Sequence, residues 1–331
     1  MNVVGAGERF VAHRLAAASP SAPAPRHAPE FGELASLVAD PAVTDVFVNG
    51  PNAVWVDRGE GLVPAAALPL SETEFRALAV KLIARGGRHI DEATPAVDVR
   101  LRDGIRVHVV LPPISTGGTL LSIRLPRVER YSLESLDAAG LFDVVSLSTV
   151  ADLVARRRNV LITGASGSGK TTLLGAMLAA ADRSDRIVAI EDVAELCVEH
   201  PHFVSLEARQ DNLEGVGGVG LERLVREALR MRPDRLVLGE CRGPEVRELL
   251  AALNTGHDGG AGTLHANSLG DVPARLEALG ALAGLNPWAI ARQAVSAFDA
   301  VLHLQRRGTR RVIAGHGRLE LDDRDRLVVL V

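Results

Sequence analysis

Short apolar runs alternate with segments of helical spacing through the second half of the chain. Four of these runs have the composition of strands buried on both faces of a parallel sheet: 160–163, 187–190, 236–238 and 261–264. Helical spacing predicts helices over 148–155, 170–181, 221–231, 245–253 and 271–282. Because strands and helices alternate, we predict a mainly parallel sheet with crossover connections. The tail departs from this pattern and predicts antiparallel strands over 300–305, 311–314, 319–322 and 327–330.

The first half of the chain predicts a smaller domain of mixed helices and strands. Ser71 with Glu74 forms a capping-box start for a helix that ends at Gly86–Gly87. Alternating and apolar runs predict strands over 44–48, 53–56, 96–101, 105–110 and 120–125. Two of the expected turns are marked by Asn49–Gly50 and Asp103–Gly104.

These patterns divide the 331 residues into four parts. Residues 1–29 end in a proline-rich stretch that cannot sustain a helix or a strand ladder, so we expect this segment to be flexible. Residues 30–127 form the smaller mixed α/β domain and 128–137 a linker. Residues 138–331 form the larger domain with the parallel sheet. The length suits two domains of ordinary size.

The charge balance argues against direct contact with nucleic acid. Lys and Arg total 37 against 41 Asp and Glu, which gives a net charge of −4 and a pI near 6.2. Aromatic residues make up 3% of the chain, so stacking platforms for single strands are not expected either.

Cysteine use and hydropathy favour the cytosol. Cys197 and Cys241 are too few for a disulfide framework or a zinc site, and both sit in apolar runs. The first 18 residues carry charges and lack the apolar core of a signal peptide. No apolar run reaches the roughly 18 residues that a membrane span requires. We therefore expect a cytosolic protein without a transmembrane segment, which could still dock on a membrane protein.

One glycine-rich turn carries a specific chemistry. It follows the apolar run Val160–Ile162, precedes a helix, and matches G-x-x-x-x-G-K-[ST]. Its glycines allow backbone N–H groups to converge on phosphate oxygens, and the helix start adds a positive dipole end. Lys170 can reach the β- and γ-phosphates, and Thr171 offers a hydroxyl to Mg²⁺. The predicted nucleotide-binding residues are Gly164, Ala165, Ser166, Gly167, Ser168, Gly169, Lys170, Thr171 and Thr172. We conclude that the chain binds a nucleoside triphosphate with Mg²⁺.

Acidic residues at the ends of two neighbouring strands are candidates for the metal and for the general base. Glu240 directly follows an apolar strand, so its carboxylate should emerge at the phosphate edge and position the attacking water. An acid in this place is also common as a solvated cap of the next helix. Glu191, Asp192 and Glu195 follow another strand and could hold Mg²⁺ or share the base role, and the pattern does not divide these tasks.

His257 and His265 flank a short predicted strand. His265, at its carboxyl end, could donate to the γ-phosphate and respond to its loss, although a single histidine is more often structural. The surroundings offer too few ligands for zinc.

Four motifs in this order make the chain resemble the ATPases of the type II/type IV secretion superfamily, and most of all the Tad/Flp pilus-assembly branch. The motifs are the P-loop, an aspartate box over 190–196, a Walker B segment over 232–243 and a histidine box over 254–267. The segment 205–209, followed by Asn212, is typical of that branch. The resemblance implies a RecA-like P-loop domain preceded by a smaller α/β domain.

The resemblance assigns a role to two arginines of the first domain. Arg100 and Arg124 match strand residues that reach the nucleotide phosphates across an interdomain cleft, from the same chain or from a neighbour. A cation delivered in this way stabilises transition-state charge. Both could instead be solvated strand residues, and Arg106 and Arg127 are weaker candidates. The catalytic set implied is Glu240, Glu191, Glu195, His265, Arg100 and Arg124, with Thr171, Glu191 and Glu240 at the metal.

The resemblance further implies a homo-hexameric ATPase at the cytoplasmic face of the inner membrane. Such a ring would drive platform proteins of a Tad/Flp pilus or of a secretion system. A conjugation motor that serves DNA transfer and a nucleotide-gated ring with little turnover are the alternatives.

Overall fold

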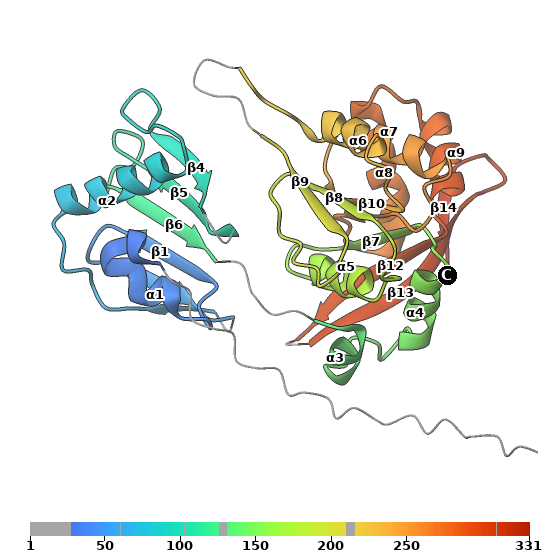
Figure 1. Cartoon of the computed structure of the whole chain (residues 1–331), viewed down its shortest axis with the longest axis horizontal. Helices are drawn as coiled ribbons and strands as arrows, with labels where there is room; N and C mark the ends of the chain where they lie inside the picture. The colour runs from blue at the N-terminus through green and yellow to red at the C-terminus, as the bar shows by residue number, and fades with distance from the viewer. Residues whose placement is uncertain (1–27, 60, 102–103, 126–130, 210–215, 309) are drawn as a thin grey trace, which may run out of the picture.

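The computed structural model describes residues 28–59, 61–101, 104–125, 131–209, 216–308 and 310–331. These residues form two β-sheets (Figure 1). The smaller sheet packs on one hydrophobic core, and the larger sheet lies between two. None of the helices in these ranges is long and apolar enough to cross a membrane.

The smaller sheet has six strands in the order β3-β2-β1-β6-β5-β4, and all of its pairs are antiparallel. Its strands are β1 (Asp45–Asn49), β2 (Val54–Asp57), β3 (Leu62–Pro64), β4 (Ala96–Arg100), β5 (Arg106–Val110) and β6 (Leu120–Arg124). Alternate residues are buried, so one face of the sheet packs on the core. The other, called the polar face below, carries mostly polar side chains together with Phe47, Val110 and Leu120.

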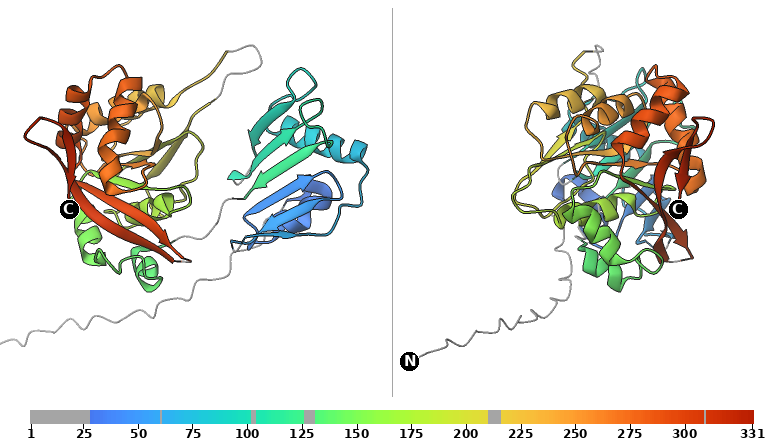
Figure 2. Two further views of the ribbon diagram at one scale, coloured as in Figure 1. Left: turned by 180° about the vertical axis from the view of Figure 1, so that it is seen from behind. Right: turned by 90° about the vertical axis from the view of Figure 1, so that its right-hand side faces the viewer.

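In the ranges that the structure describes, helices cover the core face of this sheet and leave its other face without a helix. They are a 3-10 helix (Pro29–Leu34), α1 (Ala35–Ala39) and α2 (Glu72–Arg85). Both views show α1 and α2 on the side away from the larger sheet, so the polar face is turned toward the second domain (Figures 1 and 2). Ser71 accepts from the N–H of Glu74, while Glu74 accepts from the N–H of Ser71 at 2.8 Å, which confirms the predicted capping box.

The larger sheet has eight strands in the order β14-β13-β12-β7-β11-β10-β8-β9. Its strands are β7 (Val160–Gly164), β8 (Ile187–Glu191), β9 (Phe203–Glu207), β10 (Arg235–Cys241), β11 (Ala261–Leu264), β12 (Ala300–Arg307), β13 (Arg310–Leu321) and β14 (Leu327–Leu330). From β12 to β9 all neighbours are parallel, whereas β13 and β14 add antiparallel pairs at one edge. The predicted mainly parallel sheet is confirmed.

Helices cover both faces of the larger sheet (Figure 2). One face packs on α6 (Leu221–Leu229), α7 (Glu245–Leu253), α8 (Val272–Leu282) and α9 (Pro287–Ala297). The other packs on α3 (Leu133–Ala138), α4 (Leu147–Ala155) and α5 (Lys170–Ala179). On β7 the alternation is direct, since Leu161 enters the first core and Val160 and Ile162 the second. Fully buried central strands explain why the sequence reads as continuous apolar runs there.

Several elements differ from the sequence-based expectation. The two tail strands expected at 311–314 and 319–322 are one strand, β13, and β12 pairs in parallel with β7 on its other side. The residues between the two expected strands, Gly315, His316, Gly317 and Arg318, interrupted the apolar signal. The short strand β3, the strand β9 and the helix α9 were not predicted.

The boundaries of the first domain also differ from those expected from the sequence. Residues 126–130 and 1–27 lie outside the described residues, and Pro29 already opens the 3-10 helix. The segment expected to be a linker contains α3, which starts with a capping box between Ser132 and Ser135. Leu133 and Leu136 of α3 join the core of the larger domain.

Candidate functional site

The glycine-rich turn lies at the carboxyl end of β7, in the middle of the parallel sheet. Gly164, Gly167 and Gly169 have φ angles of 150°, 70° and 100°, a region that side chains with a Cβ rarely adopt. A Cβ on Gly164 would lie 2.5 Å from the carbonyl oxygen of Leu304 and 2.6 Å from Oγ of Ser168. The loop therefore depends on glycine at this position to form its narrow cradle.

Lys170 and Ser168 line the cradle from within. Nζ of Lys170 donates to the carbonyl oxygens of Gly164 and Ala165, both at 3.0 Å, and so braces the loop. Oγ of Ser168 is buried and has no hydrogen-bond partner among the described residues. Burial lowers the pKa of Lys170, and the negative charge of Glu240 opposes this shift. An unpaired hydroxyl and a desolvated cation in one cradle suit a phosphate group.

Glu240 lies at the end of β10 and collects the polar groups of the site. Arg242 donates from Nε to Oε2 of Glu240 at 2.6 Å, and Nε2 of His265 contacts the other carboxylate oxygen. Arg242 also lies 3.6 Å from Asp192. The Glu240 side chain is only 18% exposed. β11 lies beside β7 and β10 lies beside β11, all in parallel, so Glu240 and His265 are at the same sheet edge as the P-loop.

His265 is held in an environment that favours its neutral form. Burial lowers the pKa of His265, and the charge of Lys170 lowers it further, while Glu240 acts in the opposite direction. A neutral imidazole can donate one hydrogen bond and accept another. His257, in contrast, precedes β11 at the other edge of the sheet and contacts the carbonyl oxygen of Ala252 at 3.2 Å.

The carboxylate of Glu191 is committed to its own loop. It accepts from the N–H groups of Glu195 at 2.9 Å and Leu196 at 3.1 Å. A Cβ on Gly239 would lie 2.6 Å from Cγ of Glu191, so this side chain packs under the residue that precedes Glu240. Burial raises the pKa of Glu191 to about 7, against the amide hydrogen bonds that lower it. Glu191 therefore supports the loop and the strand end beneath the site.

Three arginines of the smaller sheet form a cross-strand row on its polar face. Arg100 is paired in register with Arg106, and Arg106 with Arg124. Arg100 donates to the carbonyl oxygen of Ala194 at 2.8 Å and pairs with Glu207, while Arg106 pairs with Glu195 at 2.9 Å. Two of the three arginines thus contact the aspartate-box region directly.

The side chain of Arg124 forms no hydrogen bond or ion pair within the part of the chain that the structure describes, and Arg127 lies outside that part. Arg106, a weaker candidate from the sequence, has the closer contact. Sequence reasoning also gave no role to Arg242, although it stands two residues after Glu240. A signal for Arg106 was present in the sequence. If the strands on either side of Asp103–Gly104 form a hairpin, Arg106 lies opposite Arg100 and on the same face of the sheet.

These residues fit a nucleoside triphosphate with its metal. No cluster of three or more His, Cys, Asp or Glu side chains in the described ranges could hold a metal ion by itself. Mg²⁺ characteristically uses few protein ligands together with substrate phosphates. Thr171, at the start of α5 in the P-loop, can supply its hydroxyl, and Glu240 a carboxylate or a water-mediated contact.

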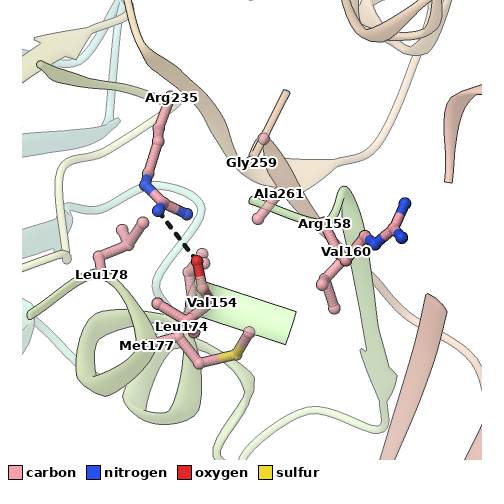
Figure 3. A pocket seen from close by; sticks show the side chains of 10 residues that line it. Val154, Arg158, Val160, Leu174, Met177, Leu178, Arg235, Gly259 and Ala261 are labelled. Carbon is pink, nitrogen blue, oxygen red and sulfur yellow. Dashed lines mark hydrogen bonds between the residues drawn. The ribbon is translucent and has the colours of Figure 1, made fainter. Parts of the chain in front are cut away.

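A small cavity at the amino edge of the sheet is a separate feature. It is lined by Val160, Ala261 and Arg235, the first residues of three strands, and by Met177 and neighbouring side chains (Figure 3). Arg235 donates to the carbonyl oxygen of Val154 at 3.0 Å and to Asp185 at 2.6 Å. Ligands of parallel sheets bind at the carboxyl edge, so we assign this cavity to packing.

The parallel sheet, the P-loop at its centre and the acid two strands away on β10 define a P-loop NTPase. The model of the Type II/IV secretion system protein family matches residues 28–312, and the chain belongs to this family.

Named relatives and a solved structure extend this result. A Mycobacterium tuberculosis (strain H37Rv) protein described as "Putative conjugal transfer protein" is 49% identical over 290 residues, which cover 86% of this chain and 82% of the relative. The type IV secretion system protein VirB11 of Bartonella quintana is 30% identical over 269 residues, 71% of this chain and 75% of the relative. The ADP-bound pilus retraction motor PilT shares the fold, with a TM-score of 0.56 and 19% identity over 90% of this chain and 80% of PilT. The superfamily resemblance is confirmed, and the Tad/Flp branch stays a prediction.

Proposed function

We propose that the protein is a Mg-ATP-hydrolysing motor. The observation that carries the proposal is the placement of Glu240 against His265, on strands that end at the same sheet edge as the loop with Lys170. Hydrolysis of a phosphate anhydride requires a cradle, a metal and a group that positions water, and the site offers a candidate for each.

In this mechanism Lys170 binds the phosphates and balances their charge as the bond to the leaving group breaks. Glu240 orients the attacking water and accepts its proton, and Arg242 holds the carboxylate in place. His265 donates a hydrogen bond to the terminal phosphate and responds to its departure. Bound Mg²⁺, held through Thr171, would supply additional charge neutralisation. Glu191 supports the loop after β8 by accepting hydrogen bonds from its backbone N–H groups, and Glu195 connects this loop to Arg106 of the smaller domain.

The smaller domain, which carries the arginine row, is the part that moves in this mechanism. Arg100 and Arg106 contact Glu207 and Glu195 at the border of the site, and Arg124 stands beside them in register. Closure of the smaller domain would carry these cations toward the phosphates, which couples the domain movement to the nucleotide state.

We further propose a homo-hexamer that works at the inner face of the cytoplasmic membrane on platform proteins of a Tad/Flp-type pilus or a secretion system. Membership of the secretion family supports an assembly of this kind. The sequence motif over 205–209 supports the Tad/Flp branch.

A conjugation-associated ATPase is the second candidate. It is favoured by the name of the Mycobacterium tuberculosis relative, which shares 49% of its residues with the chain over 290 positions. The net charge of −4 counts against direct DNA contact, so in that case the motor would act through protein partners. A nucleotide-gated ring with little turnover is the third candidate, and the complete set of Lys170, Glu240 and His265 argues for turnover.

Phosphate release by the purified full chain tests the proposal. We expect Mg²⁺-dependent release by the wild type and none above background by Lys170→Ala. Equal release by the two proteins would contradict hydrolysis at this site. Tight ATP binding by the wild type without release would favour the gated ring.

A further inference from the structure

The β12–β13 hairpin carries four arginines beyond the phosphate edge of the larger sheet. Leu304 of β12 is the register partner of Gly164, where β7 ends and the P-loop begins. The strand continues for three residues past that point, and its partner strand returns through Arg310 and Arg311. The four arginines, Arg306 and Arg307 of β12 and Arg310 and Arg311 of β13, therefore belong to a hairpin whose first strand lies directly beside the strand that leads into the P-loop.

Strand register sorts these arginines into two pairs. Arg306 is the cross-strand partner of Arg311, and Arg307 is the partner of Arg310. Directly opposed residues point to one face and the next pair points to the other. The two pairs thus lie on opposite faces of the same hairpin.

The pair Arg306 and Arg311 is on the face of the nucleotide loop. Nε of Arg311 donates to the carbonyl oxygen of Gly167 at 3.2 Å. A Cβ on Gly169 would lie 3.1 Å from Cδ of Arg311. The Arg311 side chain therefore lies against the backbone of the P-loop itself.

These guanidiniums have no anionic partner within the described chain. None of the four arginines forms an ion pair there, and all four side chains are exposed. Arg306 uses one donor, from Nε to the carbonyl oxygen of Gly308 at 3.0 Å. The remaining donors on this face are free for a ligand with negative oxygens.

The order of the strands indicates how a nucleotide bound in the P-loop is oriented. Glu240 on β10 and His265 after β11 lie on one side of β7, and β12 lies on the other. The terminal phosphate must face Glu240 for hydrolysis. The opposite end of the molecule, with its α-phosphate and ribose, therefore extends toward β12.

We propose that Arg306 and Arg311 bind the α-phosphate and ribose end of the nucleotide in the P-loop. This inference rests on the proposed function and adds a second anchor to its site. A guanidinium fork suits two phosphate oxygens at once. ADP and ATP share this end, so Arg306 and Arg311 increase the affinity for both nucleotides. The bond-breaking step depends instead on Glu240 and His265, on the other side of β7.

Equilibrium binding of ADP, measured by calorimetry on the full chain, tests the proposal. The variants are Arg306→Gln/Arg311→Gln and the matched control Arg307→Gln/Arg310→Gln, which removes the same two charges from the other face. Inorganic pyrophosphate is the second probe, because it can occupy the P-loop but lacks the nucleoside end. Lys170→Ala verifies that binding uses the P-loop.

We expect the first variant to bind ADP at least tenfold more weakly than the wild type, and the control to remain within threefold. Pyrophosphate binding should stay within threefold in both. Equal ADP affinity of the first variant and the wild type would overturn the inference, as would equal losses in both variants or an equal loss for pyrophosphate. If the wild type fails to bind ADP, or Lys170→Ala binds it unchanged, the proposed function itself is wrong and this inference falls with it.

Discussion

The guanidinium of Arg100 donates a 2.8 Å hydrogen bond to the carbonyl oxygen of Ala194, which joins the smaller sheet to the loop after β8. Ala194 stands between Glu191, whose carboxylate supports this loop, and Glu195, which pairs with Arg106. A movement of the loop therefore acts on the arginine row through the main chain as well as through charged side chains.

Loss of Arg100 should impair turnover more than binding. We expect Arg100→Ala to lower kcat by on the order of a thousandfold, because an arginine that reaches the transferred phosphate contributes about that much. Steady-state phosphate release measures the effect. Arg85→Ala, an exposed change at the end of α2, is the control and should retain the wild-type rate. Equal losses in the two variants would show that the arginine row has no special role.

The buried carboxyl of Glu191 predicts a pH-dependent difference in stability. Its pKa is raised from 4.5 to about 7 in the folded chain, so the stabilisation by its protonated form is complete below about pH 4.5 and is lost as pH rises through 7. Glu191→Gln keeps the neutral form at every pH. Without nucleotide, the free energy of unfolding of the variant relative to that of the wild type should increase by on the order of 3 kcal/mol between pH 4.5 and pH 8.

Urea unfolding of both proteins at several pH values measures this difference. Asp192→Asn, which removes a carboxylate from an exposed position of the same loop, is the control variant. A constant difference between Glu191→Gln and the wild type across this range would contradict the shifted pKa.

The ion pairs at the amino edge of the sheet predict a structural effect without a catalytic one. Asp185 is fully buried and pairs with Arg235, whose side chain is 5% exposed, and with Arg157. Asp185→Ala leaves Arg235 buried without its counter-charge and should cost about 3–5 kcal/mol. Asp152→Ala, which breaks an exposed pair with Arg156, should cost under about 0.5 kcal/mol. Urea unfolding measures both, and equal costs would contradict a buried pair.

The sequence predicts well those parts of the fold that depend on local or continuous patterns. The strand Val160–Gly164 and its loop were recognisable because a motif, an apolar run and a helix follow one another. The capping box at Ser71 likewise depends only on residues three positions apart.

Features that depend on long-range pairing were harder to predict from the sequence. β12 lies beside β7 although some 140 residues separate Leu304 from Gly164, and the Arg306–Arg311 pair acquires its place only through that contact. Arg106 was ranked below Arg124 because a single strand pattern does not tell which arginine will face Glu195. Both depend on tertiary contacts that a local pattern does not encode.

The proposed hydrolysis depends most on Glu240, which activates the water that attacks an ATP molecule held by Lys170. The most direct measurement is ATP binding and single-turnover hydrolysis by Glu240→Gln beside the wild type. We predict ATP affinity within about threefold of the wild type, and hydrolysis slower by roughly a hundred- to ten-thousandfold, because the amide cannot accept the proton of the water. Hydrolysis at the wild-type rate by Glu240→Gln would contradict this role of Glu240.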